Sequence, residues 1–177
     1  MLSSAEFDRL IAPMQERMVN CVWRIMHDSA DTDDVIQEVL LQIWTKFAEV
    51  RRHPNPPALI LCFCTHRALD HRRKMRTRET TLNDFRIRAG DAPPNSNPAF
   101  AQAEQREQIL AFLRQLPARE AEAISLHALE EMSPPEISAA MGCTESTVRV
   151  LLARARQRFR SGFKPRALSG QTSATPH

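Results

Sequence analysis

The sequence predicts an all-α protein, and three observations support this prediction. Apolar side chains recur three or four residues apart through most of the chain, which is the spacing of helices. Aromatic residues make up only 6% of the chain and tyrosine is absent, whereas β-sandwiches and barrels usually use more. The 4 glycines are too few for a fold built on tight hairpins.

Apolar spacing predicts helices in the N-terminal half over three stretches. The first covers residues 4–28, and Pro13 should kink or split it. The second carries its apolar face from Val35 to Phe47, with Asp31 as the expected N-cap. A proline-rich segment at 53–57 ends it, and a third helix is expected from about residue 58 to 76, apolar at first and then basic.

The C-terminal half shows helical spacing over residues 99–115, 118–129, 135–141 and 145–160. Between the halves, Gly90 and the prolines of 93–98 predict an extended linker. We therefore expect two small helical domains, residues 1–78 and 99–164, joined by a flexible linker at 79–98 and followed by a disordered tail at 165–177. Because the linker has no periodic apolar face, the two halves should separate.

The chain carries no apolar run that could span a bilayer and no signal peptide, so we expect a cytoplasmic protein without membrane insertion. Its 4 cysteines are then expected to be reduced thiols. The net charge of +3 is modest, but its distribution is uneven. Acids gather near residues 31–38 and bases at 67–78 and 149–166, which suggests one surface for a protein and two for a polyanion.

Residues 133–156 have the pattern of a helix-turn-helix. Small apolar residues would form the contact between two steeply crossing helices, and Gly142 would supply the turn. A helical hairpin with a solvated arginine face is the alternative, yet Glu145 is the only acid on a helix with five arginines. The expected interhelical contacts are Ile137, Ala140, Val148 and Leu152, and the candidate DNA-binding residues are Glu145, Ser146, Thr147, Arg149, Val150 and Arg154.

Two further candidate surfaces lie in the N-terminal half. A polar and acidic strip on one face of the second helix is available to a protein partner, and it comprises Asp34, Gln37, Glu38 and Gln42. The end of the third helix is basic enough to bind phosphates, through His66, Arg67, His71, Arg72, Arg73, Lys74 and Arg76.

These motifs together resemble those of bacterial sigma factors of the extracytoplasmic-function group. Residues 31–44 (DTDDVIQEVLLQIW) and 68–74 (ALDHRRK) resemble sigma region two, and Leu116-Pro-Ala-Arg-Glu120 with the helix-turn-helix resembles region four. The resemblance implies that the chain binds core RNA polymerase, through the clamp of its largest subunit and its flap. It also implies promoter DNA as a ligand, with the basic helix and loop 51–57 at the melted −10 element and the last helix at the −35 element. An anti-sigma factor is the expected regulator, and a stress or envelope response the expected role.

The chain departs from the family pattern at two places. Leu59 stands where the family usually has tryptophan, in a loop region unusually rich in proline, and Val150 and Leu151 replace residues that are often polar.

Two alternatives stay open: a stand-alone helix-turn-helix regulator that binds as a dimer, and an interaction module that does not read DNA. Cys62, Cys64 and His66 do not complete a metal site, because Cys64 lies round the helix from the other two. No catalytic motif or cofactor fingerprint is present, so we expect neither an enzyme nor a cofactor.

Overall fold

The computed structural model describes residues 4–83 and 98–162, with the side chains of 4–75 and 105–162. Within these residues the chain is helical and has no strand. The predicted tail at 165–177 and most of the predicted linker at 79–98 lie outside the described residues. The elements are α1 (Ser4–Ile11), the 3-10 turn η1 (Ala12–Met14), α2 (Gln15–Met26), α3 (Ser29–Thr45), α4 (Phe47–Arg52), α5 (Pro56–Asn83), α6 (Pro98–Gln115), α7 (Ala118–Leu129), α8 (Pro134–Met141) and α9 (Glu145–Gly162).

Local chemistry sets the helix boundaries in the N-terminal half. Pro13 lies in η1, so the predicted first helix is split there into α1 and α2. α2 ends at His27, whose left-handed backbone (φ 54°) lets its N–H bond to the carbonyl of Trp23. The prediction of Asp31 as the N-cap of α3 is wrong: the cap is Asp28, whose side chain accepts a hydrogen bond from the N–H of Asp31. Asp31 itself lies in the first turn.

The helix-turn-helix has the caps that its sequence indicates. Ser133 and Glu136 form a reciprocal capping box at the start of α8, and hydrogen bonds from Ser133 lower the pKa of the Glu136 carboxyl. α8 ends at Gly142, whose φ of 61° favours glycine. The predicted contacts between α8 and α9 are confirmed, because all four side chains are buried: Ile137, Ala140, Val148 and Leu152.

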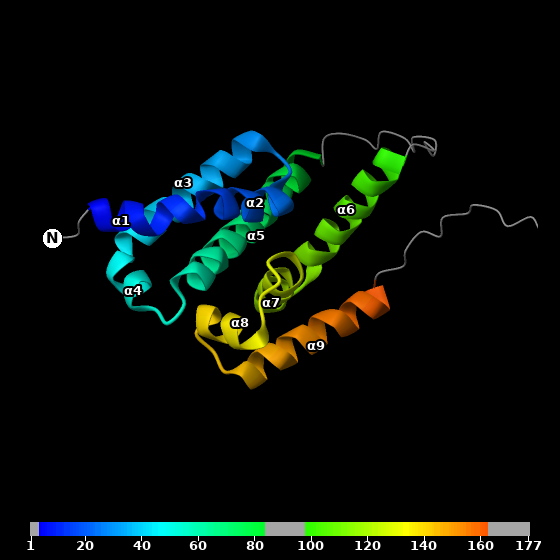
Figure 1. Ribbon diagram of the computed structural model, residues 1–177. Helices are drawn as coiled ribbons and strands as arrows, with labels where there is room; N and C mark the ends of the chain where they lie inside the picture. The colour runs from blue at the N-terminus through cyan, green and yellow to red at the C-terminus, as the bar shows by residue number, and fades with distance from the viewer. Residues whose placement is uncertain (1–3, 84–97, 163–177) are drawn as a thin grey trace, which may run out of the picture.

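α5 is the central helix of the structure (Figure 1). It packs against α2 and α3 on one side and against α7 and α8 on the other, while α9 packs on α7 and α8. The buried apolar residues of both halves form one connected core. The two halves are therefore in contact, although the linker sequence predicts that they separate.

None of the helices within the described residues is long and apolar enough to cross a bilayer. In the same part of the chain, no group of three or more His, Cys, Asp or Glu side chains is arranged to hold a metal ion.

Candidate nucleic-acid interface

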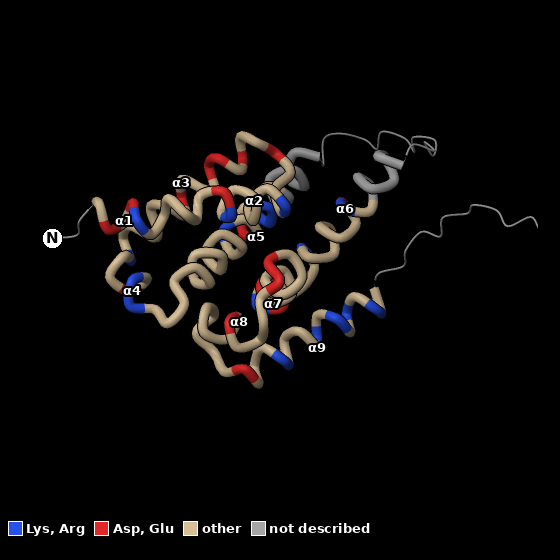
Figure 2. Tube along the Cα trace, viewed as in Figure 1, with Lys and Arg blue, Asp and Glu red and all other residues tan. Residues whose placement is uncertain are grey.

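Basic residues recur along α9, as Figure 2 shows, and those from Arg149 to Arg160 are exposed. Arg149 keeps 70% of its side chain exposed, and among the described residues it pairs only with Glu145, one turn before it, at 3.0 Å between Nε and Oε1. Arg154 and Arg156 are exposed and form no ion pair within residues 4–83 and 98–162. Such donors are available to a phosphate or to a base edge.

Hydroxyl groups form hydrogen bonds around the start of α9. Thr144 Oγ1 accepts a hydrogen bond from the N–H of Thr147, as an N-cap residue does, and its hydroxyl also contacts those of Ser146 and Thr147. Val150 is half exposed beside this turn. The six candidate DNA-binding residues thus lie in the first turns of one helix that is anchored by buried Val148 and Leu152. This is the arrangement that lets a helix enter a major groove.

The basic segment of α5 has a different environment, because most of its side chains contact other parts of the chain. Arg72 donates to the carbonyls of Ile25 and Met26 at 2.9 and 3.1 Å, and only 14% of its side chain is exposed. These carbonyls end α2 and have no partner within that helix. Arg72 therefore caps α2, a structural role that its sequence does not reveal.

Neighbouring basic residues of α5 also have partners. Arg73 donates to Asp70 and to the carbonyl of Leu116, where α6 has just ended. Arg67 donates to Gln42 at 2.9 Å and lies 3.8 Å from Glu38, so it contacts the polar strip of α3. His71 is half-buried, Lys74 is exposed, and the side chain of Arg76 lies outside the described residues.

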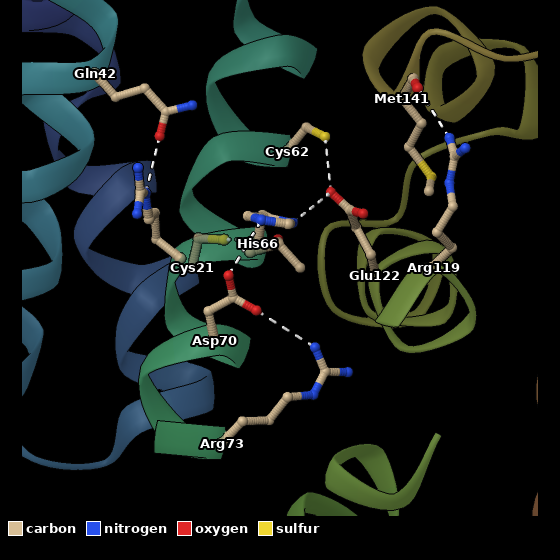
Figure 3. A network of polar contacts seen from close by, with 11 residues as sticks. Cys21, Gln42, Cys62, His66, Asp70, Arg73, Arg119, Glu122 and Met141 are labelled. Carbon is tan, nitrogen blue, oxygen red and sulfur yellow. Dashed lines mark hydrogen bonds and ion pairs between the residues drawn. The ribbon is translucent and has the colours of Figure 1, made fainter. Parts of the chain in front are cut away.

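A polar network joins α5 to the C-terminal half around Glu122 of α7 (Figure 3). Its carboxylate accepts from the thiol of Cys62 at 3.2 Å and lies 3.6 Å from Nδ1 of His66. Asp70 binds the other ring nitrogen of His66 at 3.2 Å. The hydrogen bond to Glu122 raises the pKa of His66, and burial raises that of Cys62, so the imidazole favours its charged form and the thiol stays protonated. Cys62 thus serves as a hydrogen-bond donor.

The predicted loop 51–57 is shorter in the structure, because residues 51–52 end α4 and residues 56–57 begin α5, so that only residues 53–55 connect the two helices. The C-terminal half covers this connection at one point. Nδ1 of His53 contacts the carbonyl of Asn55 and its Nε2 contacts the carbonyl of Ala139 in α8, at 2.8 and 2.9 Å. Asn55 caps α5 by accepting from the N–H of Ala58 at 3.2 Å. Leu59 is buried in the core.

The polar strip on α3 remains largely open. Asp34, Gln37 and Glu38 are exposed, while Gln42 is half-buried and bound to Arg67. Sequence reasoning missed Leu41, which lies on the same helix face and is 65% exposed. Leu41 lies three residues after Glu38 and four after Gln37, and this helical spacing could have placed it on the strip. An exposed leucine beside acidic groups suits a protein partner.

Sequence reasoning also missed the residues that bind the two halves together. Arg24 of α2 donates to the carbonyl of Leu129 at the end of α7 and pairs with Glu130 at 3.3 Å. Burial raises the pKa of Glu130. No periodicity within either helix could identify such a pair, because its members are 106 residues apart.

Comparison with known families matches both halves. The family model described as Sigma-70 region 2 matches residues 10–79, and the one described as Sigma-70, region 4 matches residues 106–159. The RNA polymerase sigma-H factor of Pseudomonas aeruginosa is 24% identical over 167 residues, which are 90% of this chain and 86% of that protein. The probable RNA polymerase sigma factor RfaY of Xanthomonas campestris pv. campestris is 23% identical over 158 residues, 88% of this chain and 40% of that protein.

Two solved structures share the fold. CnrH, in complex with the cytosolic domain of CnrY, superposes with a TM-score of 0.55 at 20% identity, over 90% of this chain and 88% of CnrH. RpoE of Bartonella quintana, in complex with the anti-sigma factor NepR, gives a TM-score of 0.53 at 18% identity, over 88% of this chain and 95% of RpoE.

Proposed function

The chain belongs to the sigma-70 family, as a two-region sigma factor of the extracytoplasmic-function type, and from this premise we propose how its surfaces divide the work of initiation. A sigma factor binds core RNA polymerase and directs it to promoters, and it is not an enzyme. Under this proposal residues 1–78 form the polymerase-binding and melting domain and 99–164 the upstream-element domain. The protein works in the cytoplasm, where polymerase and chromosome are.

The proposed division of functions between the surfaces rests mainly on one observation, the exposed arginines at the start of α9. A helix held by its partner at buried positions, with exposed donors on its outer side, fits the major groove of duplex DNA. We assign Glu145, Ser146, Thr147, Arg149, Val150 and Arg154 to the upstream element. Arg149 is the residue that we assign to a base edge, because guanidinium binds guanine through two hydrogen bonds.

The α3 strip is assigned to the clamp of the largest polymerase subunit. Asp34, Gln37 and Glu38 offer charge and hydrogen bonds, and Leu41 adds apolar area in their midst. Interfaces commonly combine a small apolar centre with a polar rim. Gln42 belongs to the strip through its place on the helix, although Arg67 holds it in this structure.

Promoter melting is assigned to residues 51–57, which join α4 to α5, and to the basic part of α5. An extruded base must be captured to offset the few kcal/mol of lost stacking, and a proline-restricted loop loses less entropy when it closes on that base. Arg72, Arg73 and Lys74 would bind the adjoining phosphates, with His66, Arg67, His71 and Arg76 around them.

We also propose an anti-sigma factor as the regulator, within a stress or envelope response. This proposal is supported by likeness of fold to the Bartonella quintana RpoE, which was solved with an anti-sigma factor. A partner that covers the α3 strip would prevent binding to core polymerase.

The division is tested by a loop variant on a linear promoter fragment. We would change His53 and Pro54 to alanine and keep Asn55, because Asn55 caps α5. The variant bound to core polymerase should keep its upstream footprint but lose most of the permanganate reactivity of unpaired thymines. Glu131→Gln, an exposed change far along the chain, is the matched control. Normal opening by the loop variant would show that the loop is only a connector.

A further inference from the structure

The outer side of α9 carries a strip of uncharged residues between two rows of arginine. The members of this neutral strip lie opposite the buried side chains of the helix and are all exposed: Ser146, Val150, Ala153 and Gln157. The arginines follow its two edges, with Arg149, Arg156 and Arg160 on one side and Arg154 and Arg158 on the other. The face of α9 that is turned away from the core is thus least charged along its centre.

Val150 lies in the neutral strip and keeps 48% of its surface exposed. The other large apolar residue that is exposed in the described part of α9 is Phe159, which packs edge-on against Phe112 with 5.1 Å between the ring centroids. Ser146, one turn before Val150, has its hydroxyl 2.9 Å from that of Thr144. Val150 is therefore the member of the strip that gains most from burial, because its side chain is wholly aliphatic.

The chemistry of the major groove limits what an exposed valine can contact there. Base edges present hydrogen-bond donors and acceptors, and the apolar group among them is the 5-methyl group of thymine. A valine set against guanine, adenine or cytosine would leave such polar atoms without water or another partner, which weakens binding. Against thymine it buries one methyl group on another. Because valine is branched at Cβ, it also has little rotamer freedom to lose in a helix.

We propose that Val150 is a specificity-determining residue, which selects a T·A pair in the upstream element by contact with the 5-methyl group of thymine. The inference rests on the proposed function, since it requires the start of α9 to enter the major groove. The arginines on the two edges of the neutral strip would then face the phosphate backbones that border the groove. Arg149, next to Val150, would read a guanine within the same short block.

The test uses the full chain bound to core polymerase and needs no promoter known in advance. The holoenzyme selects duplexes from a pool of linear DNA with random sequence, and sequencing of the retained duplexes identifies the upstream block. That block is then synthesised with deoxyuridine in place of each thymine in turn. This replacement removes one methyl group and leaves the base pairing and the polar groups of the base edge unchanged. Competition binding measures the affinity of each duplex.

Deoxyuridine at one position of the upstream block should weaken binding by the wild type about fourfold, the ratio that one buried methyl-sized group provides. At that position, a C·G pair with 5-methylcytosine should bind more tightly than one with plain cytosine, because the methyl group is restored. Val150→Ala should bind the thymine and deoxyuridine duplexes equally. Val19→Ala removes an exposed valine of α2 and should keep the fourfold ratio.

The response of the wild type to the missing methyl group is measured without any change in the protein, so this part of the test does not depend on how a variant folds. Alanine favours a helix more than valine does, and Val150 is exposed, so Val150→Ala should keep the helical content of the wild type. Circular dichroism checks both valine variants.

Two results would overturn the inference and leave the proposed function in place. One is an enriched upstream block in which no thymine responds to the loss of its methyl group. The other is a methyl response that Val150→Ala retains in full. If the holoenzyme enriches no upstream block at all, the proposed function is contradicted, and the inference with it.

Discussion

The basic part of α5 and the basic face of α9 look alike in sequence, but their side chains have different roles in the structure. In α5, Arg72 and Arg73 keep 14% and 27% of their side chains exposed and bind carbonyls at the ends of other helices. In α9, Arg149 keeps 70% exposed, and its neighbour Arg154 is also exposed. The arginines of α5 thus already have hydrogen-bond acceptors in other helices, whereas those at the start of α9 are largely exposed to solvent.

A run of arginines in a sequence therefore shows where hydrogen-bond donors lie along the chain, but it does not show which groups they bind. Helix C-termini present carbonyls without intrahelical partners, and arginine is well suited to them. Arginines of this chain bind such carbonyls at several helix ends: Arg24 at the end of α7, Arg72 at the end of α2, Arg73 just after α6 and Arg119 at the end of α8. Within the described residues, Arg149, Arg154 and Arg156 of α9 are exposed and no hydrogen bond joins them to such a carbonyl.

The largest effect is expected at the α3 strip that we assign to polymerase binding, which adjoins α5 through the contact of Glu38 with Arg67. Asp34→Lys with Glu38→Lys should weaken binding to core polymerase about a hundredfold, because like charges set against each other cost several kcal/mol. Co-purification or a competition assay with core polymerase measures this. Glu16→Lys with Glu49→Lys is the control for net charge, and equal binding by both double variants would refute the assignment.

The next largest expected effect is on the free energy of unfolding, in which the two basic helices should differ. Arg72→Ala should lower the free energy of unfolding by about 2–3 kcal/mol, because it leaves two carbonyls of α2 without their charged donor. Lys74→Ala and Arg154→Ala, at exposed sites without such contacts, should each change it by about 0.5 kcal/mol or less. Urea unfolding followed by circular dichroism compares the three variants. Equal stability of all three would mean that Arg72 is not a structural cap.

For DNA binding we expect the reverse, namely that substitutions in α9 have a clear effect although they leave stability unchanged. Arg149→Ala should lower the affinity of the holoenzyme for its promoter duplex by about 1–3 kcal/mol, if one base edge is lost, and leave stability unchanged. Arg156→Ala, at a site that we expect to touch phosphate, should weaken binding to all sequences and reduce its salt dependence. A footprint that Arg149→Ala leaves unchanged would exclude the proposed orientation of α9.

The smallest effect concerns pH at the contact between the halves. The pKa of His66 is raised from its ordinary 6.5 mainly by Glu122, with Asp70 in support and with burial and Arg67 opposing. The stabilising contribution is therefore complete below pH 6.5 and is lost as pH rises through the raised value. Because His66 is 49% exposed, we expect only about 0.3–0.5 kcal/mol.

The comparison that isolates this effect is wild type against His66→Gln, unfolded in urea at pH 6 and at pH 8.5. Wild type should lose more stability than the variant between these two values. An equal loss in both proteins would show that the imidazole does not contribute through its charge.

Local patterns were sufficient to predict most of the helices. The start of α8 at Ser133, its end at Gly142 and the buried contacts of Ile137 with α9 all follow from residues within a few positions of one another. Asp28 was missed as the cap of α3 because Asp31 has the same side chain and also precedes the apolar run. Such neighbouring candidates differ only in their backbone angles.

Contacts between the halves could not be predicted in this way. The pairing of His53 with Ala139 spans 86 residues, and that of Cys62 with Glu122 spans 60. Neither follows from the spacing of apolar residues, since each depends on how two helices happen to lie in space. The donors of α5 can be identified in the sequence, whereas their partners within the chain are known only from the fold.

Transcription from a complex DNA pool tests the central claim, that the chain directs polymerase by reading duplex DNA through α9. Purified core polymerase would transcribe sheared bacterial genomic DNA with and without the chain, and the RNA 5′ ends would be sequenced. We expect new start sites that share two upstream sequence blocks, and Arg149→Ala should relax the sequence of the upstream block alone. Start sites that are the same with and without the chain would contradict the account, and would favour a regulator that acts without directing polymerase.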